Sequence, residues 1–159
     1  MPKPLLPINQ KPAIRHILEK FNYYSPTKFF ITVNYKSEIL KSYLQEIKGL
    51  FKIKMINEEK PLGTAGSLYY LKNKIKNYFF LSNCDIIVNT NYRDILDFHL
   101  KNKNDITLVV AQKSFYIPYG VSKVDKGNFE FIEKPKYNFK INVGLYLLNK
   151  NILNLVKKK

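Results

Sequence analysis

The spacing of apolar side chains predicts that helices and strands alternate through the first two thirds of the chain. Helices repeat an apolar residue every three or four positions, whereas strands show short continuous or alternating apolar runs. The predicted helices cover 11–21, 37–47, the segment after Gly66, and 91–101. The predicted strands cover 28–34, 51–56, 78–81 and 105–111. Strands that alternate with helices at these lengths imply a parallel sheet covered on both faces.

The last third of the chain has strand-like runs without intervening helices. These runs cover 119–124, 128–132 and 141–148, and a final helix is predicted from about Ile152. The sequence Asp-Lys-Gly-Asn at 125–128 favours a tight hairpin turn. We therefore expect a smaller mixed sheet here, appended to the first, with residues 1–159 forming a single α/β domain.

The composition excludes several classes of protein. At 45% hydrophobic residues the chain can bury one sizeable core. Its only cysteine, Cys84, excludes an internal disulfide and a cysteine-rich metal cluster and favours a reducing, cytoplasmic location. We find no basic-then-apolar leader and no apolar run long enough to span a bilayer, so we expect neither secretion nor membrane insertion.

The net charge of +15 raises the question of nucleic-acid binding. However, the only arginines are Arg15 and Arg93, and the lysines are spread along the whole chain. A dedicated nucleic-acid surface favours clustered cations and the planar guanidinium of arginine. A biased composition is therefore the better interpretation, and the closing Lys157 to Lys159 are expected to form a solvated tail.

A turn of small residues, Leu62 to Gly66, connects a predicted strand to a predicted helix. Gly63 and Gly66 remove Cβ atoms from this turn, so a flat ligand can approach the backbone near the helix start. The alternative is an ordinary turn capped by Thr64, which these residues alone favour.

Asp85 follows the predicted strand at 78–81. Ligands of parallel sheets bind beyond the carboxyl ends of the strands, and a lone carboxylate there suits Mg²⁺ completed by water and phosphate. An Asx turn or a helix cap explains Asp85 equally well. His99 has no nucleophile or cysteine nearby in the sequence, so we interpret it as structural.

A second set of polar residues lies in the last third of the chain. Glu133 and Lys134 follow a predicted strand, and Asn142 and Gly144 open another. Glutamate accepts hydrogen bonds from hydroxyl groups and lysine neutralises phosphate, so the group could bind a phosphorylated sugar. The alternative, which is favoured for the pair taken alone, is an exposed turn with a weak ion pair.

Taken together, six short segments resemble the sugar-phosphate nucleotidylyltransferases in their order and spacing. They are Pro2–Pro7, Pro61–Gly66, Asn83–Asp85, Pro118–Val121, Glu133–Pro135 and Asn142–Tyr146. The resemblance covers nearly the whole chain. The sequences at 33–38 and 117–121 are most similar to members that make GDP-sugars from mannose- or aminosugar-like 1-phosphates. The family resemblance implies a Rossmann-like, GT-A-like three-layer α/β/α fold with a mainly parallel sheet.

The resemblance also implies a reaction, in which a sugar 1-phosphate attacks the α-phosphorus of a nucleoside triphosphate, with GTP favoured, and pyrophosphate leaves. By resemblance, Lys3 contacts the phosphates, Asp85 holds Mg²⁺ and Lys134 contacts the sugar phosphate. The base would lie against Leu62, Gly63, Thr64, Ala65 and Gly66. The sugar would be surrounded by Tyr119, Gly120, Glu133, Asn142 and Gly144.

The chain departs from the family pattern at three places. The family's G-G-x-G-T-R loop and first strand precede the Pro-Lys segment and would lie before Met1. Cys84 replaces a glycine, and the second metal-binding aspartate would lie beyond Lys159. We therefore expect a truncated chain that is inactive by itself and marginally stable, because the absent strand would lie inside the sheet. The alternatives are a non-catalytic remnant that binds sugar nucleotide or a partner subunit, with a homo-oligomer possible, and, more distantly, a nucleic-acid module.

Overall fold

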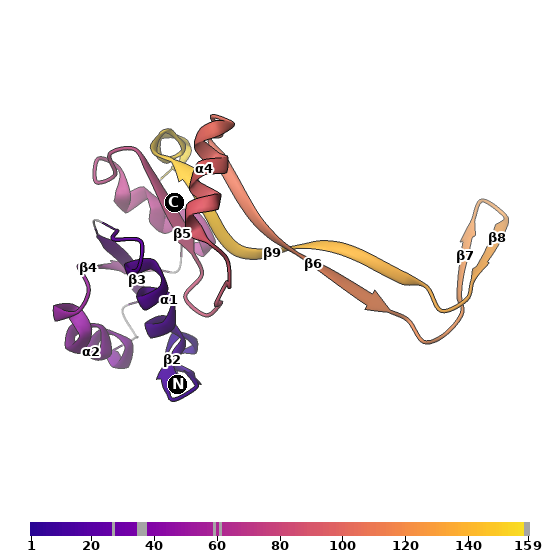
Figure 1. Cartoon of the computed structure of the whole chain (residues 1–159), viewed down its shortest axis with the longest axis horizontal. Coiled ribbons are helices and arrows are strands. Elements are labelled where there is room, and N and C mark those ends of the chain that lie inside the picture. The colour runs from indigo at the N-terminus through magenta and orange to yellow at the C-terminus, as the bar shows by residue number, and fades with distance from the viewer. Residues whose placement is uncertain (27, 35–37, 59, 61, 158–159) are drawn as a thin grey trace. The chain divides into compact units, whose positions relative to one another are not determined.

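The structure, a computed structural model, describes residues 1–26, 28–34, 38–58, 60 and 62–157 (Figure 1). The chain divides into two compact units. Unit 1 comprises Met1–Leu108 and Gly144–Lys159, and unit 2 comprises Val109–Val143. The expectation that residues 1–159 form a single domain stays a prediction. Ser37, Pro61, Lys158 and Lys159, all part of the expectations above, lie outside the described residues.

Amphipathic helices form where the apolar spacing predicts them in unit 1. The α-helices are α1 (Ala13–Asn22), α2 (Glu38–Glu46), the four-residue α3 (Gly63–Gly66) and α4 (Tyr92–Lys101). Tighter 3₁₀ turns occur at η1 (Lys3–Leu5), η2 (Ile47–Gly49), η3 (Ser67–Leu71) and η4 (Lys150–Leu155). Among the described residues, none of the helices has the length and apolar character needed to cross a membrane.

The strands of unit 1 form three small sheets. The strands are β1 (Pro7–Ile8), β2 (Lys11–Pro12), β3 (Phe29–Asn34), β4 (Ile53–Glu58), β5 (Tyr78–Ser82), and parts of β6 (Ile106–Tyr116) and β9 (Lys136–Asn149). β3 and β4 are parallel, as expected of strands joined through a helix. β1 pairs antiparallel with β2, and β5 pairs antiparallel with β9 in a sheet of order β5-β9-β6.

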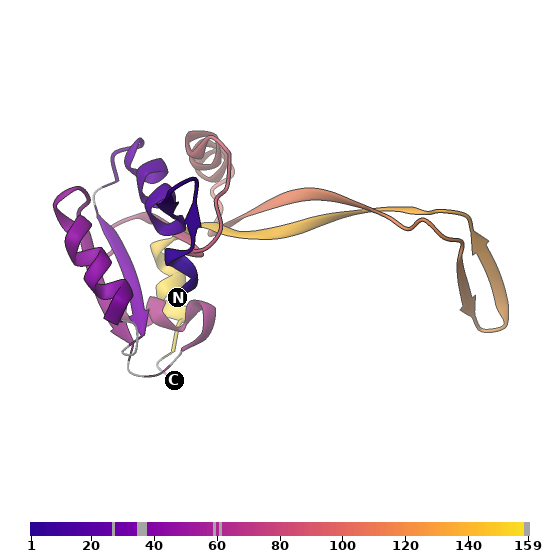
Figure 2. The ribbon, with the colours of Figure 1, turned by 90° about the horizontal axis from the view of Figure 1, so that it is seen from below.

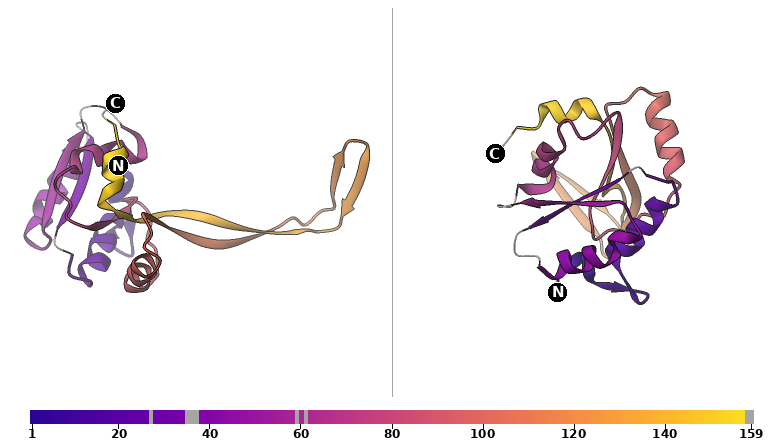
Figure 3. Two further views of the ribbon diagram at one scale, coloured as in Figure 1. Left: turned by 90° about the horizontal axis from the view of Figure 1, so that it is seen from above. Right: turned by 90° about the vertical axis from the view of Figure 1, so that its left-hand side faces the viewer.

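Two apolar clusters lie on opposite faces of β3 and β4. The first joins α1 and α2 to β3 and β4 through Leu5, Ile14, Leu18, Val33, Leu40, Leu44, Ile47, Phe51 and Ile53. Figure 2 shows α2 running alongside the β3 and β4 pair. The second consists of Ile56, Leu68, Leu71, Leu148 and Leu153. It joins η3 and η4, which lie side by side in Figure 3. The result is the three-layer α/β/α arrangement expected for this chain.

Several boundaries differ from the expected ones. Lys11 and Pro12 form β2, and α1 begins at Ala13 because Pro12 has an extended backbone with ψ of 144°. The helices expected after Gly66 and from Ile152 are mainly 3₁₀ turns. A 3₁₀ turn brings residues i and i+3 onto one face, so it shares much of its apolar spacing with an α-helix. β6 and β9 extend beyond their apolar runs into exposed segments.

Unit 2 contains the predicted hairpin. β7 (Val121–Asp125) and β8 (Asn128–Ile132) pair antiparallel around Lys126 and Gly127, whose φ angles of +46° and +86° suit a tight hairpin turn. The outer parts of β6 and β9 approach each other, with the Ser114 hydroxyl 2.6 Å from the Asn138 side-chain oxygen.

In unit 1, His99 is buried with its Nδ1 2.8 Å from the Thr107 hydroxyl, which fits its structural interpretation.

Candidate functional site

The glycine turn at the start of α3 has an open backbone surface. Gly63 has a φ of +75°, and a Cβ added there would have no neighbour within 4 Å. At Gly66 an added Cβ would lie 2.5 Å from the Leu62 Cβ, so this glycine permits close packing within the turn. Ala65 is exposed, whereas the Thr64 side chain lies outside the described residues. The turn can therefore receive a flat group against its backbone at Gly63.

Cys84 and Asp85 lie in the turn that follows β5, and the Lys3 ammonium acts electrostatically on the Cys84 thiol. Although part of Cys84 is exposed, surrounding protein atoms raise the pKa of its thiol. The Asp85 carboxylate raises this pKa further, whereas the Lys3 ammonium lowers it. The two charges therefore have opposite effects on the pKa of the same thiol. Lys3 begins η1, whose next two residues, Pro4 and Leu5, are buried.

Gly144 brings the β9 motif directly against Asn83. The Asn83 backbone N–H donates a 2.9 Å hydrogen bond to the Gly144 carbonyl, next to the paired residues Ser82 and Leu145. Gly144 has a φ of +68°, and an added Cβ would lie 2.5 Å from the Asn83 Nδ2. A glycine is therefore required there by both the backbone angle and the neighbouring side chain. Two motifs separated by about 60 residues meet at this point.

Asp85 is the candidate ligand for a divalent cation. The exposed Asp85 carboxylate forms no hydrogen bond or ion pair with the described part of the chain. Over that part, no group of three or more His, Cys, Asp and Glu side chains could hold a metal by itself. Mg²⁺ commonly binds through one or two carboxylates, with water and phosphate oxygens completing its shell. Asp85 therefore fits a metal that a phosphorylated ligand helps to bind.

The remaining candidates from the last third of the chain lie mostly in unit 2. The Ile117 N–H donates a 3.1 Å hydrogen bond to the Pro135 carbonyl, which brings the Tyr119–Gly120 and Glu133–Lys134 segments to the same end of the unit. Tyr119 is 74% exposed. The Glu133 and Lys134 side chains form an exposed 3.9 Å ion pair, as the simpler interpretation expected.

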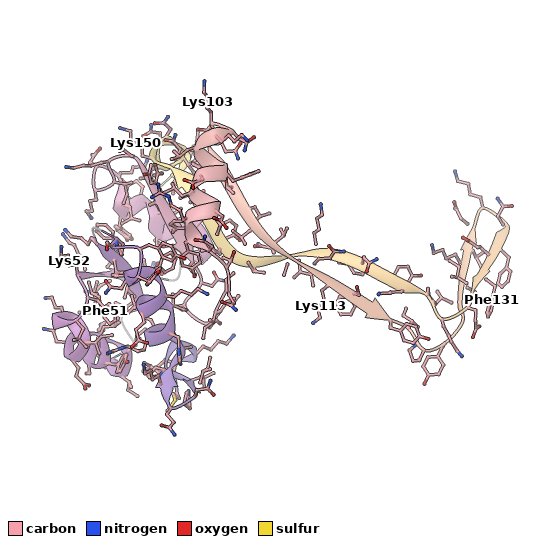
Figure 4. The ribbon with its side chains drawn as sticks, in the orientation of Figure 1. Phe51, Lys52, Lys103, Lys113, Phe131 and Lys150 are labelled. Carbon is pink, nitrogen blue, oxygen red and sulfur yellow. The ribbon has the colours of Figure 1, made fainter. Side chains whose placement is uncertain are left out.

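Two residues, Asn83 and Phe131, contact candidate site residues, although the sequence did not single them out individually. Asn83 contacts Gly144 and was recognised only as part of the Asn83–Asp85 motif. Phe131, labelled in Figure 4, lies with its ring against Gly120, where an added Cβ would collide with it. Gly120 therefore has a packing role within unit 2. Asn142 is an exposed residue of β9.

The fold and the site together define an α/β protein with an open glycine turn and a carboxylate beyond the end of a strand. The sequence matches the family described as Nucleotidyl transferase over residues 1–159. The chain belongs to this family. Its layered α/β/α fold is the one that the resemblance implied.

Curated relatives are guanylyltransferases. The chain is 32% identical to the probable mannose-1-phosphate guanylyltransferase 1 of Oryza sativa subsp. japonica, over 100% of this chain and 47% of the relative. It is 31% identical to mannose-1-phosphate guanylyltransferase 1 of Arabidopsis thaliana, over 98% of this chain and 46% of the relative. The chain thus spans about half the length of the curated relatives it matches.

Solved structures share the fold. HddC from Yersinia pseudotuberculosis complexed with GMP-PN has a TM-score of 0.75 at 23% identity, covering 96% of this chain and 69% of that one. A putative glucose-1-phosphate thymidylyltransferase from Bacillus anthracis has a TM-score of 0.71 at 19% identity. The similarity covers 96% of this chain and 64% of that one. At these identities the similarity establishes the fold alone.

Proposed function

We propose that this chain contributes nucleotide and sugar-phosphate recognition to a sugar-phosphate nucleotidylyltransferase, with GTP as the favoured donor and a mannose-like sugar 1-phosphate as the acceptor. The observation that carries the proposal is the meeting of the Gly144 and Asn83 motifs beside Asp85. The guanylyltransferase names of the curated relatives support the choice of base and sugar. The single Cys84 supports a reducing cytoplasm as the site of action.

The proposed reaction exchanges one phosphoanhydride for another. An oxygen of the sugar 1-phosphate attacks the α-phosphorus of GTP, and the bond from that phosphorus to the bridging oxygen of the β-phosphate breaks. Pyrophosphate leaves with the bonding electron pair, and a GDP-sugar forms. Because no covalent intermediate with the protein is needed, the side chains act by positioning and by neutralising charge.

Each candidate has a proposed role in this positioning. The Lys3 ammonium would neutralise the triphosphate, and Asp85 would hold Mg²⁺, which when bound offsets the charge that develops on the phosphates. The Leu62–Gly66 turn would receive the base at the open backbone of Gly63. Tyr119, Gly120, Glu133, Asn142 and Gly144 would surround the sugar, and Lys134 would contact its phosphate.

We further propose that residues 1–159 do not turn over by themselves. The six glycines of the sequence are all isolated, so no G-G-x-G-T-R loop occurs within these residues. Removal of one preorganised donor to a developing negative charge typically lowers the rate by about 10²–10³. The phosphate loop of the family would supply several such donors, so their joint absence predicts no measurable transfer.

A pyrophosphate-release assay with each nucleoside triphosphate and a panel of sugar 1-phosphates tests this proposal. Residues 1–159 should give no sustained turnover. A chain extended at Met1 by the strand and phosphate loop of the rice relative, and beyond Lys159 by the segment of that relative that holds the second metal-binding aspartate, should turn over. Asp85→Ala should abolish that activity. Sustained turnover by the unextended chain that Asp85→Ala abolishes would contradict the proposed inactivity.

The second candidate is a non-catalytic protein that retains sugar-nucleotide binding or a subunit contact. It rests on the base turn and the sugar motifs, which lie within residues 1–159, whereas no G-G-x-G-T-R loop does. Under this alternative the extended chain would remain inactive while still binding GDP-mannose. Sedimentation of the same sample would report whether it forms a homo-oligomer.

A further inference from the structure

An open pocket of about 500 Å³ lies in unit 1, at the amino ends of β3 and β4. One wall comes from residues 22–26, at the end of α1, and the other from residues 48–52, which lead into β4. The two walls adjoin where the Phe29 N–H donates a 2.8 Å hydrogen bond to the Lys52 carbonyl. Sites for small molecules commonly measure about 300–1,000 Å³. This amino-end pocket is therefore large enough for a small metabolite.

The amino-end pocket is separate from the candidate nucleotide and sugar site. β3 and β4 are parallel strands of six residues each. A strand of this length spans roughly 17 Å, at about 3.3 Å per residue. The Leu62–Gly66 turn follows the carboxyl end of β4, whereas the pocket lies at its amino end. The proposed transfer reaction therefore does not use this pocket.

Two lysines give the amino-end pocket a positive charge. Lys48 and Lys52 are exposed, and neither forms an ion pair with the described part of the chain. Within that part, no acidic residue lines the pocket, and Glu46, the nearest acidic residue to Lys48 in the sequence, lies on α2 outside the lining. A concave surface lined by charge of one sign concentrates ions of the opposite sign. The pocket therefore favours an anion.

The other lining residues supply hydrogen-bond donors and an apolar base. The side chains of Asn22 and Ser25 form no hydrogen bond with the described part of the chain, so both can donate to a ligand. A helix C-terminus disfavours anions. At the end of α1, however, the Asn22 carbonyl already accepts a 3.0 Å hydrogen bond from the Ser25 N–H. Phe51, labelled with Lys52 in Figure 4, is buried and Pro26 is half-buried, which makes the base of the pocket apolar.

We propose that the amino-end pocket binds a small phosphomonoester, with its phosphate held by Lys48 and Lys52. A phosphomonoester carries about −1.5 to −2 charges at pH 7, which matches two ammonium groups. Lysine binds phosphate as a point charge, and the Asn22 amide and Ser25 hydroxyl would donate to the remaining oxygens. A single-stranded nucleic acid needs an extended basic groove with stacking aromatic rings. A pocket between two short segments favours a small molecule instead.

Amide NMR of the full chain, titrated with glycerol 3-phosphate at constant ionic strength, tests the proposal. Saturable shifts should appear at the amides of residues 22–26 and 48–52. The double variant Lys48→Ala/Lys52→Ala should weaken binding there at least about tenfold, because both charge-assisted contacts are lost. The matched control is Lys101→Ala/Lys103→Ala, which removes two exposed lysines at the end of α4. It should leave the affinity within about twofold, since separated exposed charges are screened by salt.

Several results would overturn the proposal. They are the absence of saturable shifts at residues 22–26 and 48–52, shifts confined to Lys3, Asp85 and Lys134, and equal weakening by the two double variants. Shifts of the same size with glycerol would show that the phosphate is not recognised. Equal affinity for sulfate would show an adventitious anion site only, and would overturn the assignment to a phosphomonoester. If the pocket variant does not fold, the wild-type shifts and the sulfate comparison still decide the outcome.

Discussion

Substitution of Gly144 by alanine tests the contact on which the site depends. The backbone at Gly144 has a φ of +68°, a conformation that residues with a Cβ rarely adopt. The new Cβ would also lie 2.5 Å from the Asn83 Nδ2 and 2.9 Å from its Cγ. Gly144→Ala therefore carries two separate penalties, one from the backbone angle and one from the collision.

The magnitudes of these penalties can be separated with a matched control. A left-handed backbone destabilises an L-residue by roughly 1–2 kcal/mol. Overpacking adds about 1–3 kcal/mol, and we expect the lower end because the exposed Asn83 side chain can move. Gly63 has a similar φ of +75° but has no atom within 4 Å of an added Cβ. Gly63→Ala should therefore show only the backbone penalty, and Gly144→Ala about 1 kcal/mol more.

Urea unfolding followed by circular dichroism measures both free energies of unfolding. In an Asn83→Ala background the Cγ and Nδ2 atoms are gone, and the Asn83 Cβ at 3.4 Å is an ordinary contact. Gly144→Ala should then destabilise the chain by about as much as Gly63→Ala does. The reasoning would be refuted if Gly144→Ala destabilised the chain equally with and without Asn83→Ala. It would also be refuted if Gly144→Ala and Gly63→Ala had equal effects in the wild type.

Three further substitutions have expected outcomes. Leu44→Ala removes a fully buried side chain and should lower the free energy of unfolding by about 2–5 kcal/mol in urea titrations. Gly120→Ala should lower it by less than about 1 kcal/mol by the same assay, because the exposed Phe131 ring can swing away. Arg15 lowers the pKa of the partly exposed Glu19, so Glu19→Gln should remove about 0.3–0.5 kcal/mol at neutral pH. That difference should vanish as the pH falls through the folded-state pKa of Glu19, which a pH series of thermal unfolding checks.

The sequence predicted the elements that depend only on the residue pattern within one short segment. β3 and β4 follow from continuous and alternating apolar runs, and α2 follows from its apolar stripe. The hairpin turn at Lys126 and Gly127 follows from residue types that tolerate a positive φ. The antiparallel pairing of β5 with β9 could not be predicted in this way, because its partner residues, such as Ser82 and Leu145, are about 60 positions apart.

The candidate site shows the same division. Its motifs could be recognised in order along the chain, because each is a short run of characteristic residues. Their meeting in space depends on strand register, which places Gly144 opposite Asn83. The left-handed backbone of Gly144 and the ring of Phe131 against Gly120 depend on tertiary packing, for which the sequence carries no local signal.

Calorimetry with GDP-mannose tests the central claim, that residues 1–159 form a metal-dependent sugar-nucleotide site centred on Asp85. The wild-type chain should bind weakly in the presence of Mg²⁺, and binding should be lost when Mg²⁺ is removed or Asp85 is replaced by alanine. Asp97→Ala, which removes another exposed carboxylate, on α4 and outside the motifs, should bind like the wild type. Equal binding by the wild type and Asp85→Ala, with and without Mg²⁺, would contradict the account.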